Sequence, residues 1–509
     1  MKMNFKIPLI MTLALIMLVG CGYSPAASAE TLSRSSSSGE AVLVSSATGS
    51  SGSTAVTAAL ADMDVSVSSR DASGEYDASE AVTLAPDDDL TITKAGVYVL
   101  SGDYNGMIVV EAGEEDKVQL VLNNAAITNE NGPAIYVRSA DKVFITAAQG
   151  TVNTVSDGSD YTLTDGDTTL DAAVFSRDDL TINGAGKLTI NGNYKHAVVS
   201  KDDLVVTAAD LTVTAENVGL NGNDSVKLSG ASVSVTAGTD GIRAENGEDA
   251  DKGFVAVVDS SVTVVSGRDG IQAETAFIAE NAVLTVTSGG GSGAGSGSAS
   301  ESCKSVKAGS SVTISGGVYE IDSFDDAVHS DGSVLISGGE FTIRSRDDAI
   351  HANEKAEIAG GTLDITAGEG IEATYILISG GDVTIAATDD GINAGRKSTA
   401  YTPTVEITGG TLTITMGAGD TDGIDSNGDI IITGGTVSVN GNSIFDYDGT
   451  ATFTGGTVYA NGQQVTTLPN QFMGGMGGFD GGPGGFSGGP GGFSGGLGGF
   501  GGDHGGGRP

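Results

Sequence analysis

The sequence predicts an all-β protein folded as a single-stranded parallel β-helix, a solenoid with about 21–22 residues in each coil. Three observations support this prediction. A short acidic-apolar motif recurs at a nearly fixed interval, Gly-Gly pairs recur in the same phase, and the intervening strands are rich in β-branched residues without a competing helix signal. A solenoid explains all three, because every coil repeats the turns and strands of the coil before it.

The recurring motif has two acidic residues, a small residue and an apolar anchor, as in Asp-Asp-Ala-Ile at 347–350. In the most regular part of the chain, successive anchors are 22, 21 and 21 residues apart. This interval predicts one core-facing anchor per coil and roughly a dozen coils, stacked about 4.8 Å apart. The predicted anchors are Ile135, Val174, Val198, Leu220, Ile242, Ile271, Val306, Val328, Ile350, Ile371, Ile392, Ile424 and Ile444.

The second marker is a Gly-Gly pair followed by a strand such as "TLDIT". Such pairs begin at 316, 338, 360, 380, 409, 434 and 455, in phase with the acidic motif. Each pair predicts a turn, and the apolar residue that precedes it should face inward. Ile336, Ile358, Ile378 and Ile407 are therefore expected to stack in a column through the core.

The repeat and the composition divide the chain into five segments. We expect a lipoprotein signal peptide at 1–20, a tether rich in Ser, Ala and Gly at 21–61, and an N-terminal β capping segment at 62–130. The parallel β-helix then spans 131–468. A Gly/Phe-rich tail, predicted to be disordered, follows at 469–509.

The N-terminus has the layout of an export signal, with two lysines before the apolar run from Ile7 to Val19. It ends in Leu-Val-Gly-Cys, which resembles the lipobox that directs lipidation of Cys21 in bacterial lipoproteins. We therefore expect an exported protein, lipid-anchored at the bacterial cell surface. Cleavage after Ala29 would instead give a free secreted protein. The only membrane contact expected is the lipid anchor.

The chain carries 65 acidic and 24 basic residues, a net charge of −41. Such a charge repels nucleic acid, which excludes nucleic-acid binding. It also attracts divalent cations, and an exported protein meets calcium at concentrations that sites built of oxygen ligands can use. Calcium is therefore the expected metal.

Stacking of the coils predicts files of carboxylates about 4.8 Å apart, an arrangement that costs energy unless water, proton uptake or a cation relieves it. Calcium would relieve it, because this ion takes six to eight oxygen ligands. Asp side chains also favour turns on their own account, which would explain the motif without a metal. The predicted metal ligands are Asp325, Asp326, Asp347, Asp348, Glu369, Asp389, Asp390, Asp420, Asp422 and Asp425.

Two of the four histidines, His329 and His351, lie one coil apart in the same phase. We expect them to stack on each other at the surface. A metal or sugar contact is the alternative.

Segments such as "KVQLVLNNAAITN", "FSRDDLTINGAGKLTINGNY" and "DDAVHSDG", together with the terminal GGF tail, are similar to the bacterial cell-surface carbohydrate-binding β-helix family. The resemblance runs from about residue 75 to the C-terminus. It implies a right-handed parallel β-helix of the pectate lyase type, bound calcium, and binding of plant polysaccharides such as cellulose and polygalacturonate.

Sugar binding raises two questions of chemistry. Polygalacturonate is acidic, so a protein of this charge should bind it only when calcium bridges carboxylate to carboxylate. Neutral glycans are expected to stack on aromatic rings, and the chain has no Trp. The candidate sugar-binding residues are Tyr319, Tyr375, Phe445 and Tyr447, with Tyr194 and Tyr401 as further aromatic surfaces.

Two other functions fit the same sequence. A pectate lyase would need calcium and a Lys or Arg as base. The candidates for the base are Lys195, Arg344, Arg346 and Lys355, but none forms a recognisable constellation with the aspartates, so binding without catalysis is predicted. A calcium-stiffened adhesin or structural envelope protein without a defined glycan is the third possibility.

Overall fold

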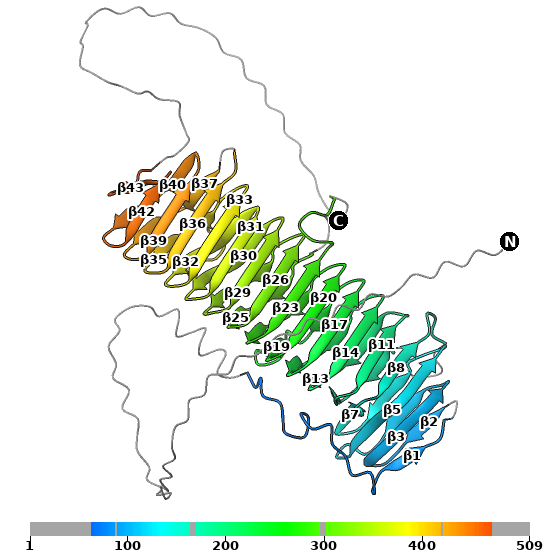
Figure 1. Cartoon of the computed structure of the whole chain (residues 1–509). Helices are drawn as coiled ribbons and strands as arrows, with labels where there is room; N and C mark the ends of the chain where they lie inside the picture. The colour runs from blue at the N-terminus through cyan, green and yellow to red at the C-terminus, as the bar shows by residue number, and fades with distance from the viewer. Residues whose placement is uncertain (1–62, 87–88, 163–168, 296–301, 419–420, 471–509) are drawn as a thin grey trace, which may run out of the picture. The chain divides into compact units, whose positions relative to one another are not determined.

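A computed structural model of the chain describes residues 63–86, 89–162, 169–295, 302–418 and 421–470. All of them belong to one unit, Gly52–Pro509, and they form strands connected by turns (Figure 1). Within these ranges no helix is long and apolar enough to cross a membrane. The predicted signal peptide, Cys21, the tether and all but the first two residues of the predicted tail lie outside the described residues.

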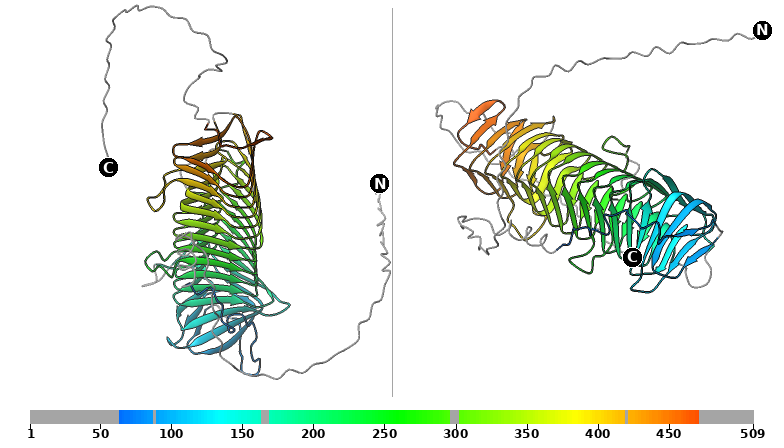
Figure 2. Two further views of the ribbon diagram at one scale, coloured as in Figure 1. Left: turned by 90° about the vertical axis from the view of Figure 1, so that its left-hand side faces the viewer. Right: turned by 60° about the horizontal axis from the view of Figure 1, so that its bottom comes forward.

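The strands form three ladders, each made by parallel pairing between successive coils, which confirms the parallel β-helix (Figures 1 and 2). Ladder A contains β2 (Leu90–Ile92), β4 (Ile108–Glu111), β6 (Ile135–Ser139), β9 (Ala172–Ser176), β12 (His196–Ser200), β15 (Leu220–Gly222), β18 (Ile242–Ala244), β21 (Ile271–Ala273), β24 (Val306–Ala308), β27 (Val328–Ser330), the first parts of β30 (Asp348–Ile358) and β32 (Glu369–Ile378), β34 (Ile392–Ala394), β37 (Asp422–Ser426) and β40 (Ser443–Tyr447).

The other two ladders complete each coil. Ladder B contains β1 (Val82–Leu84), the first parts of β3 (Gly96–Tyr104) and β5 (Lys117–Asn129), β7 (Lys142–Ala147), β10 (Asp179–Asn183), β13 (Asp203–Thr207), β16 (Ser225–Ser229), β19 (Phe254–Val258), β22 (Ala276–Glu280), β25 (Ser311–Ser315), β28 (Ser333–Ile336), the second parts of β30 and β32, β35 (Thr404–Ile407), β38 (Asp429–Ile432) and β41 (Ala451–Phe453). Ladder C contains the second parts of β3 and β5, β8 (Val152–Asp157), β11 (Lys187–Gly192), β14 (Asp210–Ala215), β17 (Ser232–Ala237), β20 (Ser261–Ser266), β23 (Val283–Ser288), β26 (Val318–Ser323), β29 (Glu340–Ser345), β31 (Thr362–Ala367), β33 (Asp382–Ala387), β36 (Thr411–Met416), β39 (Thr436–Asn440) and β42 (Thr457–Ala460), to which β43 (Gln463–Val465) adds an antiparallel strand.

The predicted anchors pair with one another along ladder A. Ile350, for example, is opposite Ile371, which in turn is opposite Ile392. The last anchor is different from the prediction: Ile424 pairs with Phe445, so Phe445 and not Ile444 continues the column.

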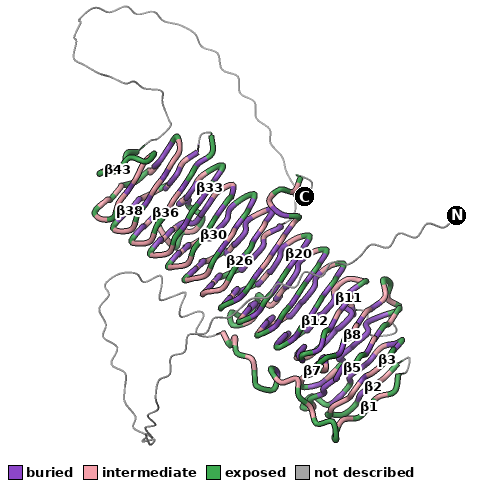
Figure 3. The backbone as a smooth tube through the Cα atoms, viewed as in Figure 1, coloured by how far each residue is buried: buried purple, intermediate pink, exposed green. Residues whose placement is uncertain are grey.

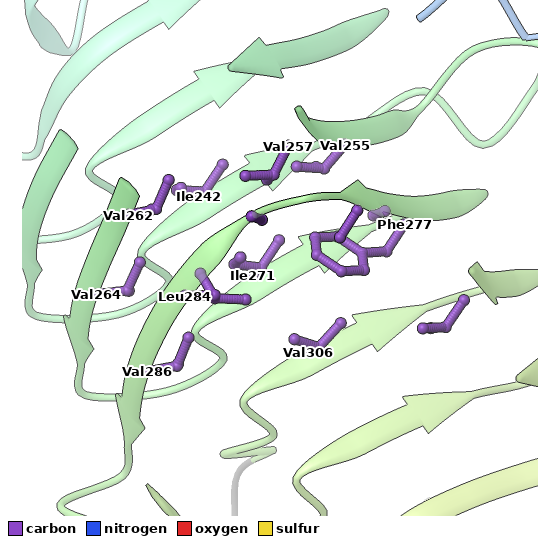
Figure 4. Close-up of a cluster of buried hydrophobic side chains, with 14 of the residues drawn as sticks. Ile242, Val255, Val257, Val262, Val264, Ile271, Phe277, Leu284, Val286 and Val306 are labelled. Atoms are coloured by element: carbon purple, nitrogen blue, oxygen red, sulfur yellow. The ribbon is translucent and has the colours of Figure 1, made fainter. Parts of the chain in front are cut away.

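The core lies inside the coils, because strand residues alternate between the two faces of each ladder. The strands of ladder C show this alternation most clearly, with buried and exposed residues in strict succession along β14, β17 and β20 (Figure 3). Figure 4 shows how side chains from three ladders meet, with Ile271, Leu284 and Phe277 contributed by different strands of one coil. The predicted column Ile336, Ile358, Ile378 and Ile407 is buried as expected.

Steric contacts explain why a small residue precedes most anchors; the exception is Ile444, which precedes Phe445. At Gly370 an added Cβ would lie 2.3 Å from the carbonyl oxygen of Gly391 and 2.7 Å from Cγ2 of Ile385. Contacts this short occur because neighbouring coils approach each other closely at this corner. A small residue is therefore favoured at this corner, and Ala349 occupies the same position one coil earlier.

The segment that is expected to cap the solenoid takes part in its ladders, since β1 to β5 pair in parallel with β3 to β8. The residues that precede β1 run across the outside of ladder B without forming a strand. Asp71 accepts a hydrogen bond from Thr181 Oγ1 (2.6 Å) and pairs with Lys142 (2.8 Å). Met63 packs further along, against Phe254. This extended segment covers the outer face of the N-terminal coils.

Candidate functional site: a file of carboxylates on ladder A

Five consecutive anchors, from Val328 to Ile424, have an acidic residue two positions before them, and these acidic residues form a file along ladder A. We call Asp326, Asp348, Glu369, Asp390 and Asp422 the acidic file, and the register of the anchors aligns them. The side chains also link the coils, because the Asp348 N–H donates to Asp326 Oδ1 (3.3 Å) and the Asp422 N–H to Asp390 Oδ1 (2.8 Å). The position that precedes Asp326 in this file is Lys304.

Lys304 neutralises the first part of the file. Its Nζ lies 2.7 Å from Asp326 Oδ2 and 3.0 Å from Asp325 Oδ2. Asp326 also accepts a hydrogen bond at 2.7 Å from Nδ1 of His329. Burial opposes ionisation of Asp326, but His329 and Lys304 outweigh it and hold the pKa of this carboxyl well below its usual range.

His351 joins the next two coils. Its Nδ1 lies 2.6 Å from Asp348 Oδ2 and 3.1 Å from Glu372 Oε2, and Glu372 Oε1 pairs with Lys397 at 2.6 Å. Burial disfavours the imidazolium, but the two carboxylates prevail and raise the pKa of His351 to about 10. The pKa of Asp348 is raised, mainly by burial and then by the neighbouring carboxylates.

Within the part of the chain that the structure describes, the C-terminal part of the file has no such cationic partner. We call Glu369, Asp389, Asp390, Asp422 and Asp425 the carboxylate cluster. Among the described residues, no Lys, Arg or His lies within 4.0 Å of these carboxylates, although Asn393 Nδ2 donates to Glu369 at 3.1 Å. One of the predicted ligands, Asp420, lies outside the described residues.

Three members of the carboxylate cluster have raised pKa values. Burial raises the pKa of Glu369 to about 7, and Glu372 adds to this effect. Burial likewise raises the pKa of Asp390 to about 6. For Asp425 the pKa rises to about 7, through burial and then the charges of Asp390 and Asp446. A divalent cation would relieve this repulsion.

The described residues contain three groups of carboxylate and imidazole side chains whose atoms lie within 4.8 Å of one another, close enough to hold a metal ion. They are Asp326, His329 and His351; Asp348, His351 and Glu372; and Asp325, Asp326 and Asp347. Lys304 and the protonated His351 already supply positive charge to these groups. The carboxylate cluster offers oxygen atoms alone, but among the described residues no three of its carboxylates have oxygen atoms within 4.8 Å of one another.

Two of the predicted sugar-binding rings are core side chains. Tyr319 is fully buried, stacks on Phe341 at 4.5 Å and donates its hydroxyl to the Gly316 carbonyl (2.8 Å). Phe445 is the buried last anchor. A ring that water cannot reach cannot stack on a sugar, so the expectation is wrong for Tyr319 and Phe445.

The remaining aromatic candidates are partly exposed. Tyr447 donates its hydroxyl to the Leu468 carbonyl at 3.2 Å. Tyr375, on ladder B, donates to Glu406, and its ring centroid lies 5.4 Å from that of Tyr401. Tyr194 stacks on Tyr161 at 4.2 Å. The pairs with Tyr401 and Tyr161 are thus the candidate aromatic surfaces.

Several site residues escaped prediction. Lys304 occupies a position of the acidic file but breaks its acidic pattern. Glu372 and Asp446 each follow an anchor by one residue, as His351 and Asp425 do, and this shared phase was the available signal. Lys397 lies in a longer turn outside the repeat, so no periodicity points to it.

Comparison with known proteins places these features in a family. The chain is 36% identical to a carbohydrate-binding domain-containing protein of Acetivibrio thermocellus over 129 residues, which is 25% of this chain and 45% of that relative; the match thus covers about half of the relative's length. A solved structure titled as the polysaccharide lyase-like protein from C. thermocellum, gadolinium derivative, aligns with 34% identity and a TM-score of 0.40 over 42% of this chain and 91% of that one. The model of the carbohydrate-binding domain-containing protein family matches residues 86–349 and 339–464. The chain therefore belongs to this carbohydrate-binding family.

Proposed function

We propose that the protein binds plant-type polysaccharides without cleaving them, and that its binding of acidic glycans such as polygalacturonate depends on calcium. The observation that carries this proposal is the carboxylate cluster. It combines several oxygen ligands, raised carboxyl pKa values and the absence of a cationic partner among the described residues, on a chain that belongs to a carbohydrate-binding family.

Calcium would be held by Glu369, Asp390, Asp422 and Asp425, whose oxygens are the ligands this ion prefers. When bound, it supplies positive charge at a surface that otherwise repels a polyuronate. With a net charge of −41 the protein cannot attract polygalacturonate directly, so the ion has to connect protein and glycan carboxylates. Neutral glycans such as cellulose would instead stack on the Tyr375–Tyr401 pair, which needs no metal.

The test is binding of polygalacturonate to the full chain by calorimetry, with calcium and with EDTA. We expect binding only with calcium, and we expect the double variant Asp390→Asn/Asp425→Asn to lose it. Asp364→Asn, an exposed carboxylate of β31 on ladder C, is the matched control and should bind like the wild type. Equal binding in EDTA would refute the calcium bridge. Cellulose binding should be lost in Tyr401→Ala and unaffected by EDTA.

Absence of catalysis is proposed because the lysines beside the acidic file are poor bases. Burial opposes the charged form of Lys304 and Lys397, yet their carboxylate partners raise both pKa values, whereas a catalytic base needs a lowered one. Of the predicted bases, Lys355 is buried in an ion pair with Glu357 at 2.7 Å, and Arg344 lines a groove on ladder C. Release of unsaturated uronate from polygalacturonate with calcium would establish a lyase.

A glycan array with and without calcium separates binding from a purely structural role. If no glycan binds in either condition while calcium still raises the unfolding temperature, the protein is a calcium-stiffened adhesin or envelope component.

We also propose that the chain is exported and anchored at the bacterial surface through lipidated Cys21, because Leu18 to Cys21 have the lipobox pattern. Metabolic labelling with a fatty acid should mark the wild type and leave Cys21→Ala unmarked and released into the medium.

A further inference from the structure

Two histidines stack on adjacent coils of ladder A. His329 is directly opposite His351 in the register of β27 and β30, and the ring centroids are 4.7 Å apart with an angle of 19° between the ring planes. Each side chain is 12% exposed, so both rings reach the surface of the solenoid. The coil repeat therefore holds two imidazoles side by side.

A buried carboxylate fixes the orientation of each ring. Nδ1 of His329 lies 2.7 Å from Asp326, and Nδ1 of His351 lies 2.6 Å from Asp348; these two Asp side chains are only 5% and 6% exposed. A metal-binding His commonly donates one ring N–H to a carboxylate, which sets the tautomer and leaves the other nitrogen for the ion. Both rings have this arrangement, with Nε2 as the remaining nitrogen.

Oxygen atoms lie beside both Nε2 atoms. His329 Nε2 is 3.3 Å from Asp331 Oδ1, and His351 Nε2 is 3.3 Å from Asn353 Oδ1. Asn353 Nδ2 in turn lies 3.3 Å from Asp331 Oδ1, so these four side chains form one group. The Asp331 side chain is 57% exposed, which gives an ion access from solvent.

We propose that His329 Nε2, His351 Nε2 and Asp331 bind a divalent transition-metal ion of the zinc, nickel or copper class. Imidazole nitrogen suits these ions, whereas calcium takes oxygen ligands. Zinc–nitrogen distances are about 2.1 Å, so the two rings must tilt toward each other when the ion binds. Asp348 and Glu372 stabilise positive charge on the His351 ring. The same two carboxylates strengthen His351 as a ligand, because a bound ion replaces the proton on Nε2 and is also positively charged. This site is separate from the carboxylate cluster and does not depend on the proposed function.

The experiment is calorimetric titration of the metal-free full chain with zinc in the presence of excess calcium. We expect one tight site, and we expect His329→Ala and His351→Ala each to weaken zinc binding at least about tenfold. Asp348→Asn, which removes a positioning carboxylate, should weaken it about 10–100-fold. His196→Ala is the matched control. His196 also contacts an Asp, with Nε2 3.7 Å from Asp171, but none of the other described residues places a second imidazole beside it, so its loss should leave zinc binding unchanged.

A spectroscopic measurement on the wild type tests the site without relying on a variant that fails to fold. Copper bound at this site should show hyperfine coupling to two imidazole nitrogens by electron paramagnetic resonance. Coupling to fewer than two, unchanged zinc affinity in folded His329→Ala, loss of binding in His504→Ala, or displacement of zinc by calcium would each overturn the proposal.

Discussion

In calcium-free buffer the folded protein should lose stability as the pH rises from about 4 to about 7, because Glu369, Asp390 and Asp425 have raised pKa values. In the unfolded chain these groups ionise near their ordinary values of 4.5 and 3.8, whereas in the folded protein they keep their protons up to about pH 7, 6 and 7. Within this window the folded state binds more protons than the unfolded state, so stability falls as the pH rises. Above about pH 7 the loss is complete.

The size of this loss of stability follows from the pKa shifts of the three carboxyl groups. One pKa unit corresponds to about 1.4 kcal/mol, so Asp425 alone sets an upper bound of about 4 kcal/mol. Water screens these partly exposed groups, and we expect about 3 kcal/mol for the three together. Urea unfolding followed by circular dichroism at pH 4, 5, 6, 7 and 8 measures the share of Asp390 and Asp425 in this loss, as the difference between the wild type and Asp390→Asn/Asp425→Asn.

Calcium provides the second half of this test. Saturating calcium should restore the lost stability at pH 8 and have little effect at pH 4, where the carboxyl groups hold protons and do not bind the ion. If the wild type and the double variant have the same pH dependence, or if calcium stabilises both equally, the carboxylate cluster is not the site of uncompensated charge.

Three substitutions probe the parts of the solenoid that position the site, each measured by urea unfolding. Lys304→Met leaves the buried Asp326 carboxylate without its ammonium partner and should lower the free energy of unfolding by about 3 kcal/mol. An unchanged urea midpoint would mean that Asp326 takes up a proton instead. Gly370→Ala should lower the free energy of unfolding by more than about 2 kcal/mol, because its Cβ would collide with the next coil. Gly230→Ala is the control, because a Cβ there meets no atom within 4 Å. It should lower the free energy of unfolding by about 1 kcal/mol, from its positive φ alone. Phe445→Ala should lower the free energy of unfolding by about 3–5 kcal/mol and leave the glycan affinity of the folded protein unchanged. A loss of affinity without a loss of stability would mean that the ring contacts the glycan.

The repeat made the fold predictable, because each coil shows the same side chain at the same phase and a solenoid has few alternative arrangements of strands. The prediction failed where the phase was ambiguous. Ile444 and Phe445 are adjacent apolar residues in a coil without the Asp-Asp corner. Both are buried, and the pairing of Ile424 with Phe445 reveals which of them continues the column of anchors. The segment before β1 is held by individual contacts such as Asp71 with Lys142, which leave no periodic signal.

The candidate site was predictable in position and less so in charge. Stacking at one phase correctly brings Asp348 opposite Glu369. Lys304 occupies the same position of the repeat, but a search for recurring acidic residues does not identify a lysine. Strand alternation could have identified Tyr319 as a core residue, because it has the same parity as the inward Ile321. Partners such as Lys397 come from turns whose path the sequence does not determine.

Ladder A thus contains two electrostatic environments, one around Asp326 and one around Asp390. They differ in the charge of the side chain that occupies the same position one coil earlier. Lys304 precedes Asp326 in the acidic file, whereas Glu369 precedes Asp390. Glu369→Lys should therefore give the carboxylate cluster the arrangement that Lys304 gives Asp326, with an ammonium group between Asp348 and Asp390. We expect this variant to be more stable than the wild type in EDTA at pH 8, to bind calcium at least about tenfold more weakly, and to gain little stability from calcium. Calorimetry and urea unfolding measure these three effects. If Glu369→Lys binds calcium as tightly as the wild type, the ion is held elsewhere and the missing cation is not what makes this part of the ladder a calcium site.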